Sequence, residues 1–70
     1  MYIVIELQTM AGGTVGNFIW SYTSKDEAFS KFHSVLSTAA VSSLPVHSAV
    51  ILDNYGRQIA AQAFTHEVVE

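Results

Sequence analysis

Three histidines are the side chains of this chain that titrate near neutral pH, and they are the first candidates for chemistry. His33 flanks the apolar stripe of a predicted helix, while His47 and His66 lie toward one end of a predicted C-terminal hairpin. A three-histidine metal site is conceivable, but no H-x-x-x-H or H-x-E spacing supports it. Half-exposed histidines that hydrogen-bond to the backbone are the favoured interpretation. We therefore predict neither a bound metal nor a cofactor.

Nucleophilic and phosphate chemistry find little support in the remaining residues. Ser30 and Ser37 stand three and four residues from His33 on one side of the predicted helix. No strained nucleophile turn or oxyanion loop accompanies them. The carboxylates belong to a helix cap, a turn and a C-terminal tail, and the paired glycines join two strands instead of opening a helix. We expect a protein that is not an enzyme.

Basic and aromatic side chains leave room for ligand binding. Cationic groups would bind the charged part of a small anionic ligand such as a nucleotide, and a ring would stack on its base. The alternative is packing alone, because aromatic residues on a strand commonly belong to a core or an interface. The candidate ligand- or partner-binding residues are those that are polar or aromatic without an obvious core role: Trp20, Tyr22, Lys25, His33, His47, Tyr55 and Arg57.

Two strands are predicted at the start of the chain, over residues 1–9 and 14–22, because side chains alternate between two faces there. The intervening glycines supply the backbone freedom that a tight reversal needs. The Gly12–Gly13 loop could be a simple turn or a mobile lid, and the sequence leaves both open. Gly16 within the second strand predicts a bulge or a close approach of another backbone or ligand.

A helix follows, and its start is the clearest local signal in the sequence. Ser24 and Glu27 have the spacing of a capping box, in which each side chain satisfies an exposed backbone N–H. The helix should end near residues 41–43, since Pro45 bars its continuation. Its apolar stripe would lie on a sheet and consists of Ala28, Phe29, Phe32, Val35, Leu36, Ala39 and Ala40.

A second hairpin completes the chain, with strands predicted over residues 46–53 and 57–66. The segment between them reads as a type I turn closed by Gly56 in the left-handed region. This turn predicts a register that pairs Asp53 with Arg57, Ile51 with Ile59, Ala49 with Ala61 and His47 with Ala63.

The predicted order is ββαββ, an α+β fold with one helix on a four-stranded, mostly antiparallel sheet. One helix can cover one side of a small sheet but not both. Several apolar side chains therefore cannot all point at it, and we expect a homo-oligomer in which a second subunit covers the remainder. These side chains are Tyr2, Val4, Phe18, Trp20, Val50 and Leu52.

The composition agrees with a single small domain over residues 1–70. Half of the 70 residues are hydrophobic and 13% are charged. The absence of cysteine excludes disulfides, thiolate zinc sites and iron–sulfur clusters. A net charge of −3 disfavours nucleic acid as a partner. No signal peptide or run of about 18–20 apolar residues is present, so we expect no membrane partner and a cytoplasmic location.

Four segments taken together resemble short proteins encoded by bacteriophages and prophages of Gram-positive bacteria. They are MYIVIELQT, GGTVGN, YTSKDEA-x3-FH and AAVSSLPVHSAV, and the resemblance covers most of the chain up to Val50. It contains no catalytic motif and therefore assigns no site residue. It implies a small accessory protein in the cytoplasm of a bacterial host, where such proteins commonly block a host defence protein or sequester a defence signalling nucleotide.

Two functions remain open from the sequence. The first is a non-enzymatic, homo-oligomeric binding protein, an antagonist of bacterial defence that sequesters a signalling nucleotide or blocks a host protein. The alternative is a structural or interaction module, such as a virion or scaffold component, in which an apolar sheet face is the interface.

Overall fold

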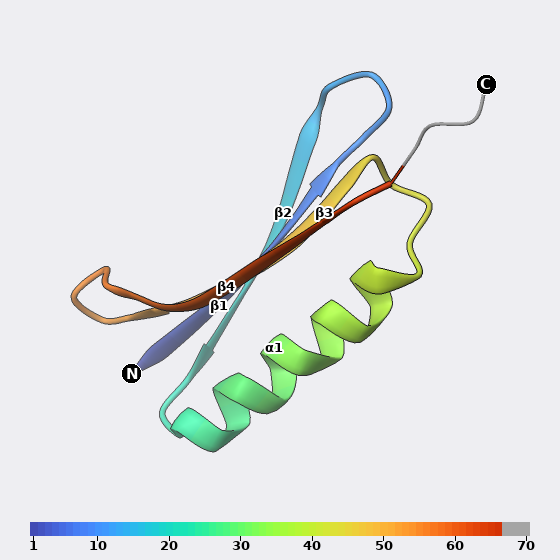
Figure 1. Ribbon diagram of the computed structural model, residues 1–70. Helices are drawn as coiled ribbons and strands as arrows, with labels where there is room; N and C mark the ends of the chain where they lie inside the picture. The colour runs from blue at the N-terminus through green and yellow to red at the C-terminus, as the bar shows by residue number, and fades with distance from the viewer. Residues whose placement is uncertain (67–70) are drawn as a thin grey trace.

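The computed structural model describes residues 1–66 and shows two β-hairpins separated by one helix (Figure 1). The strands are β1 (Tyr2–Thr9), β2 (Val15–Tyr22), β3 (Val46–Asp53) and β4 (Gln58–Thr65), and the helix is α1 (Lys25–Ala40). The strands form one antiparallel sheet in the order β2-β1-β3-β4. The predicted α+β fold with the order ββαββ is confirmed, and each strand end lies within one residue of its predicted position.

Helix α1 lies along one side of the sheet and connects its two halves (Figure 1). Its 16 residues extend about 24 Å, which is close to the length of an eight-residue strand. The helix therefore returns the chain to the end of the sheet where β3 can start beside β1. In the 1–66 segment, no helix is long and apolar enough to cross a membrane.

The core lies between α1 and the two central strands. Val4 and Ile51 are opposite each other on β1 and β3 and are fully buried, and Phe32 from α1 packs against them. Burial of a side chain of this size contributes about 1.5–3 kcal/mol. The predicted helix stripe is confirmed except at its end, where Ala40 is exposed. The buried hydrophobic residues are Val4, Ala28, Phe32, Val35, Ala39, Ala49 and Ile51.

The N-terminus of α1 is capped by one half of the predicted capping box. Ser24 has extended backbone angles, and its Oγ accepts a hydrogen bond from the Glu27 backbone N–H at 3.4 Å. Within the described residues, Glu27 does not return a bond to the Ser24 N–H. Ala40 is the last helical residue, so the helix ends one residue before the end predicted near residues 41–43.

The turn between β3 and β4 has the predicted form. The Asp53 N–H donates to the Arg57 carbonyl at 3.0 Å, and Gly56 adopts a left-handed φ of +80°. The Asp53 carboxylate also accepts from the backbone N–H groups of Tyr55 and Arg57, at 2.8 and 2.9 Å. The geometry of this turn is therefore predictable from the sequence.

The register that we predicted beyond this turn is wrong by one residue. The β3–β4 ladder shifts between Ile51 and Leu52, so Leu52 pairs with Gln58 while Ile51 pairs with Ala60. Ile59 is the extra residue of this irregularity. The shift places the small Ala60 against the core, whereas Ile59 stays 36% exposed. The remaining predicted pairs change in the same way, to Ala49 with Gln62 and His47 with Phe64.

Gly16 does not form the bulge that its position predicts. The β1–β2 ladder runs without a shift, and Gly16 pairs with Gln8. A Cβ at Gly16 would meet its nearest atom, the Met10 Cε, at an ordinary contact distance of 3.9 Å.

Candidate functional site

Two of the predicted binding residues, Trp20 and Tyr22, lie on the side of β2 that faces α1, and Trp20 contacts Lys31 there. The Lys31 ammonium lies 4.0 Å from the centroid of the Trp20 ring, the geometry of a cation–π contact. The i, i+4 spacing of Glu27 and Lys31 on the helix would allow an ion pair between Lys31 and the carboxylate one turn earlier. Its contact is instead with a ring on another element, and no local sequence signal points to it.

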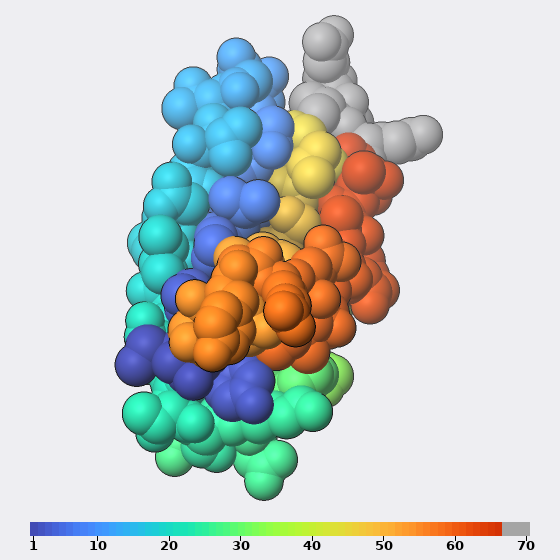
Figure 2. Space-filling model, turned by 90° about the vertical axis from the view of Figure 1, so that its left-hand side faces the viewer, coloured from blue at the N-terminus to red at the C-terminus, as the bar shows by residue number. Residues whose placement is uncertain are grey.

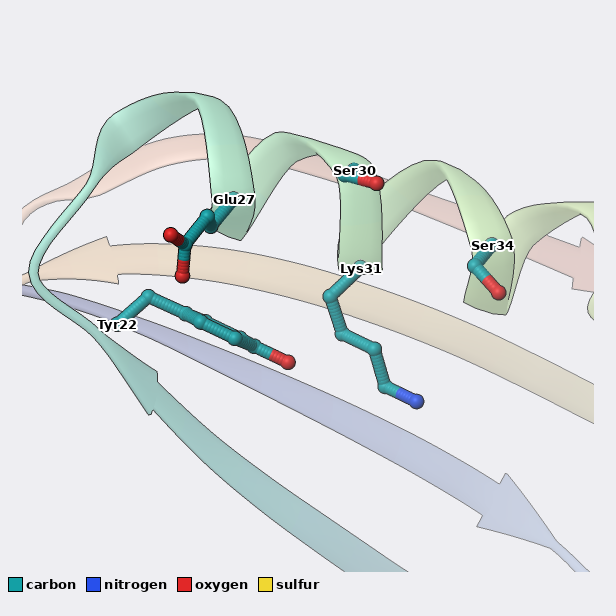
Figure 3. A pocket seen from close by; sticks show the side chains of 5 residues that line it. All are labelled: Tyr22, Glu27, Ser30, Lys31 and Ser34. Carbon is teal, nitrogen blue, oxygen red and sulfur yellow. The ribbon is translucent and has the colours of Figure 1, made fainter.

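A groove lies beside this contact, at the edge where α1 overhangs β2 (Figure 3). Its volume is about 340 Å³, within the range of small-molecule sites. In Figure 3 the Tyr22 ring extends along its floor toward Lys31, with Glu27 above the ring. The groove thus combines one aromatic ring with its phenolic hydroxyl, one ammonium, one carboxylate and two serine hydroxyl groups. Its lining residues are Tyr22, Glu27, Ser30, Lys31 and Ser34.

The other predicted binding residues lie in separate places. The Lys25 ammonium lies 5.9 Å from the ring centroid of Phe29, and the exposed His33 ring is 6.0 Å from the same ring. Tyr55 and Arg57 contact each other at 5.6 Å within the exposed β3–β4 turn. The predicted site residues do not converge on one site, and of them Tyr22 alone lines the β2–α1 groove.

His47 is not the half-exposed, backbone-bonded histidine that the sequence suggested. Its side chain is 2% exposed, and its Nε2 lies 2.5 Å from a carboxylate oxygen of Glu6 on the neighbouring strand. Gln8 donates a hydrogen bond to the same oxygen at 3.0 Å. Because a carboxylate accepts, Nε2 is the donor, and the buried Nδ1 has no hydrogen-bond partner among residues 1–66. Together, His47, Glu6 and Gln8 form a part-buried polar network on the helix side of the sheet.

His66 fits the predicted backbone-bonded role. Its Nε2 donates to the carbonyl of Ala39 at 2.8 Å, and its backbone N–H donates to the Pro45 carbonyl at 2.9 Å. His66 thereby ties the end of β4 to the last turn of α1. No group of three possible metal ligands occurs among the residues that the structure describes.

A second surface is the side of the sheet that faces away from α1, here called the open face. Figure 2 shows the strands side by side in the order β2, β1, β3 and β4, with the helix visible only below them. By strand alternation and register, the open face consists of Ile3, Ile5, Leu7, Thr9, Val15, Asn17, Ile19, Ser21, Val46, Ser48, Val50, Leu52, Gln58, Ala61, Ala63 and Thr65.

The open face carries no charged side chain and exposes large apolar groups. Ile19 is 60% exposed, Val15 54% and Leu7 37%. A shallow hollow of about 460 Å³ lies over β3 and β4, where small side chains such as Ala61 and Ala63 line it. The face is therefore raised and bulky over β2 and lower over β4.

The six apolar side chains that, by the sequence, cannot all point at the helix are divided between the two sides of the sheet, as predicted. The helix side holds Tyr2, Val4, Phe18 and Trp20, while Val50 and Leu52 lie on the open face.

Comparisons with known protein families, with curated proteins and with solved structures found no match to this chain.

Proposed function

We propose that the chain is a non-enzymatic, homo-oligomeric binding protein that self-associates through the open face. The observation that carries this proposal is an uncharged sheet surface rich in Ile, Leu and Val, which α1 leaves uncovered. Contiguous apolar surface of this kind is rare on monomers and marks an interaction site. Self-association would bury it and would leave the helix side free for a ligand or another protein.

The first test is the mass in solution, measured by sedimentation equilibrium. The wild type should sediment as a multiple of 7.6 kDa. Val50→Lys places a charge in the middle of the open face and should shift the mass toward the monomer, because burial of an unpaired charge is costly. Ser37→Lys adds the same charge on the exposed side of α1 and should leave the mass unchanged. A wild type that stays monomeric at high concentration would overturn the proposal.

The β2–α1 groove supports a small anionic ligand as the species bound. Lys31 supplies an ammonium and Tyr22 a ring, the two groups that a nucleotide requires. The Glu27 carboxylate in the same groove selects against a phosphate near the helix start, so the phosphate would lie toward Lys31. Together with the phage resemblance, this supports a role in sequestering a defence signalling nucleotide.

The ligand is tested by thermal denaturation in the presence of cyclic and ADP-ribose-type nucleotides. A ligand that binds only the folded state stabilises it by about 2.7 kcal/mol at a concentration of 100 times its Kd, and this stabilisation raises the melting temperature. Lys31→Met should abolish the shift. Lys25→Met removes the same charge outside the groove and should preserve it. A panel that produces no shift at saturation would remove the nucleotide from the proposal.

The alternative function is an assembly or interaction module whose open face binds a different protein, such as a host protein or a virion component. The same apolar surface favours it. The mass separates the two functions, because this module would be a monomer until its partner is added.

A further inference from the structure

Side-chain size decreases from β2 to β4 in the two central rows of the open face, and in the row nearest the β3–β4 turn it increases from Ser21 on β2 to Gln58 on β4. The register aligns one residue of each strand in a row that reads, from β2 to β4, Ile19, Ile5, Val50 and Ala61. The next row reads Asn17, Leu7, Ser48 and Ala63. In both rows the larger side chains belong to the β2–β1 half and the smaller ones to the β3–β4 half.

This gradient distinguishes the two simple ways in which two copies could stack face to face. A two-fold axis parallel to the strands places β2 of one copy over β4 of its partner and keeps each row at its own level. Ile19 then lies over the partner's Ala61. An axis across the strands would place β2 over β2, so that bulky side chains collide at one edge and small ones leave a gap at the other.

The size of the face is adequate for a dimer. Strands about 4.8 Å apart, with eight residues of about 3.3 Å each, give a face of about 500 Å². Two stacked copies bury on the order of 1,000 Å², the lower limit for a specific interface. A second copy is also the occupant that supplies an equally large and uncharged surface without leaving a charge buried.

We infer that two copies of this chain stack through their open faces about a two-fold axis parallel to the strands, with Ile19 of each copy over the Ala61–Ala63 segment of the other. This inference rests on the self-association proposed above and adds its geometry. Packed sheets are usually rotated by about 30° relative to each other. Level with the two central rows, this rotation moves an edge strand by less than the distance between successive residues on one face of a strand. In these rows β2 therefore remains over the partner's β4.

A charge-pair experiment tests this geometry at the two edge strands. Ile19→Lys alone should raise the dimer dissociation constant at least about tenfold, because the ammonium would lie on the partner's Ala61 methyl group. Combining it with Ala61→Glu should restore most of the affinity, since each Lys would then meet a Glu across the interface. The control combines Ile19→Lys with Ser37→Glu, which has the same net charge but places the Glu on α1, and should remain as weak as the single variant.

The outcomes separate the geometry from the proposed function. A wild-type dimer whose Lys–Glu variant is no tighter than the Ser37→Glu control overturns the geometry and leaves self-association intact. A monomeric wild type overturns both. Far-UV circular dichroism checks that each variant is folded, and the exchanged pair, Ile19→Glu with Ala61→Lys, repeats the test should the first pair fail to fold. Recovery of the dimer in either pair supports the inferred two-fold axis.

Discussion

The buried contact between His47 and Glu6 is the residue-scale feature with the largest expected effect on stability. The side chains are 2% and 13% exposed, and they belong to strands that pair directly. When one member of a buried polar pair is removed, the other is left without a hydrogen-bond partner, and the loss of folding stability is large. Replacing both members by apolar groups costs less stability. The pair therefore couples β1 to β3 beneath the helix.

A double-mutant cycle measures this coupling. We expect Glu6→Leu and His47→Leu each to reduce the free energy of unfolding by about 1–3 kcal/mol, because each leaves a buried polar group without its partner. The double variant should cost less than the sum of the two. Urea unfolding followed by the fluorescence of Trp20, at one fixed protein concentration, provides the measurement. Additive costs would show that the contact does not hold the strands together.

At the scale of elements, the turn at Gly56 is where a single backbone conformation is required. Gly56 has a φ of +80° and no atom within 4 Å of an added Cβ, so space is not limiting there. Gly56→Ala should destabilise the fold by about 1 kcal/mol through backbone strain alone. Gly12→Ala is the matched control, because that position is equally open and has no left-handed φ. Equal unfolding midpoints in urea for the two variants would contradict this.

The elements themselves are predictable because their signals are local. Strand alternation, the Ser24 cap and the Gly56 turn each involve residues a few positions apart. The failures are long-range. The hydrogen bond between His47 and Glu6 joins residues 41 positions apart, and the cation–π contact of Lys31 is with Trp20 on a separate strand. The irregularity at Ile59 accompanies the packing of Ala60 against the core, and that core includes helix residues that the hairpin sequence does not contain.

At the scale of the whole molecule, the two sides of the sheet differ in what they carry. The helix side holds the hydrophobic core, the buried His47–Glu6 network and the groove with Lys31, while the open face is uncharged. A chain of 70 residues buries only about 60% of its unfolded surface as a monomer. Stacking of open faces would therefore add apolar burial that a monomer of this size lacks, so stability and association should be linked.

This linkage predicts that the melting temperature depends on protein concentration. Because a dimer is favoured by mass action, each tenfold dilution should lower the melting temperature by about 3–5 °C for a chain of this size. The Ile19→Lys variant, which we expect to be largely monomeric, should melt at a lower temperature with a much weaker dependence on dilution. Scanning calorimetry or circular dichroism over a hundredfold range of concentration provides the measurement. A wild-type melting temperature that does not change with concentration would mean that the open face contributes nothing to folding through self-association.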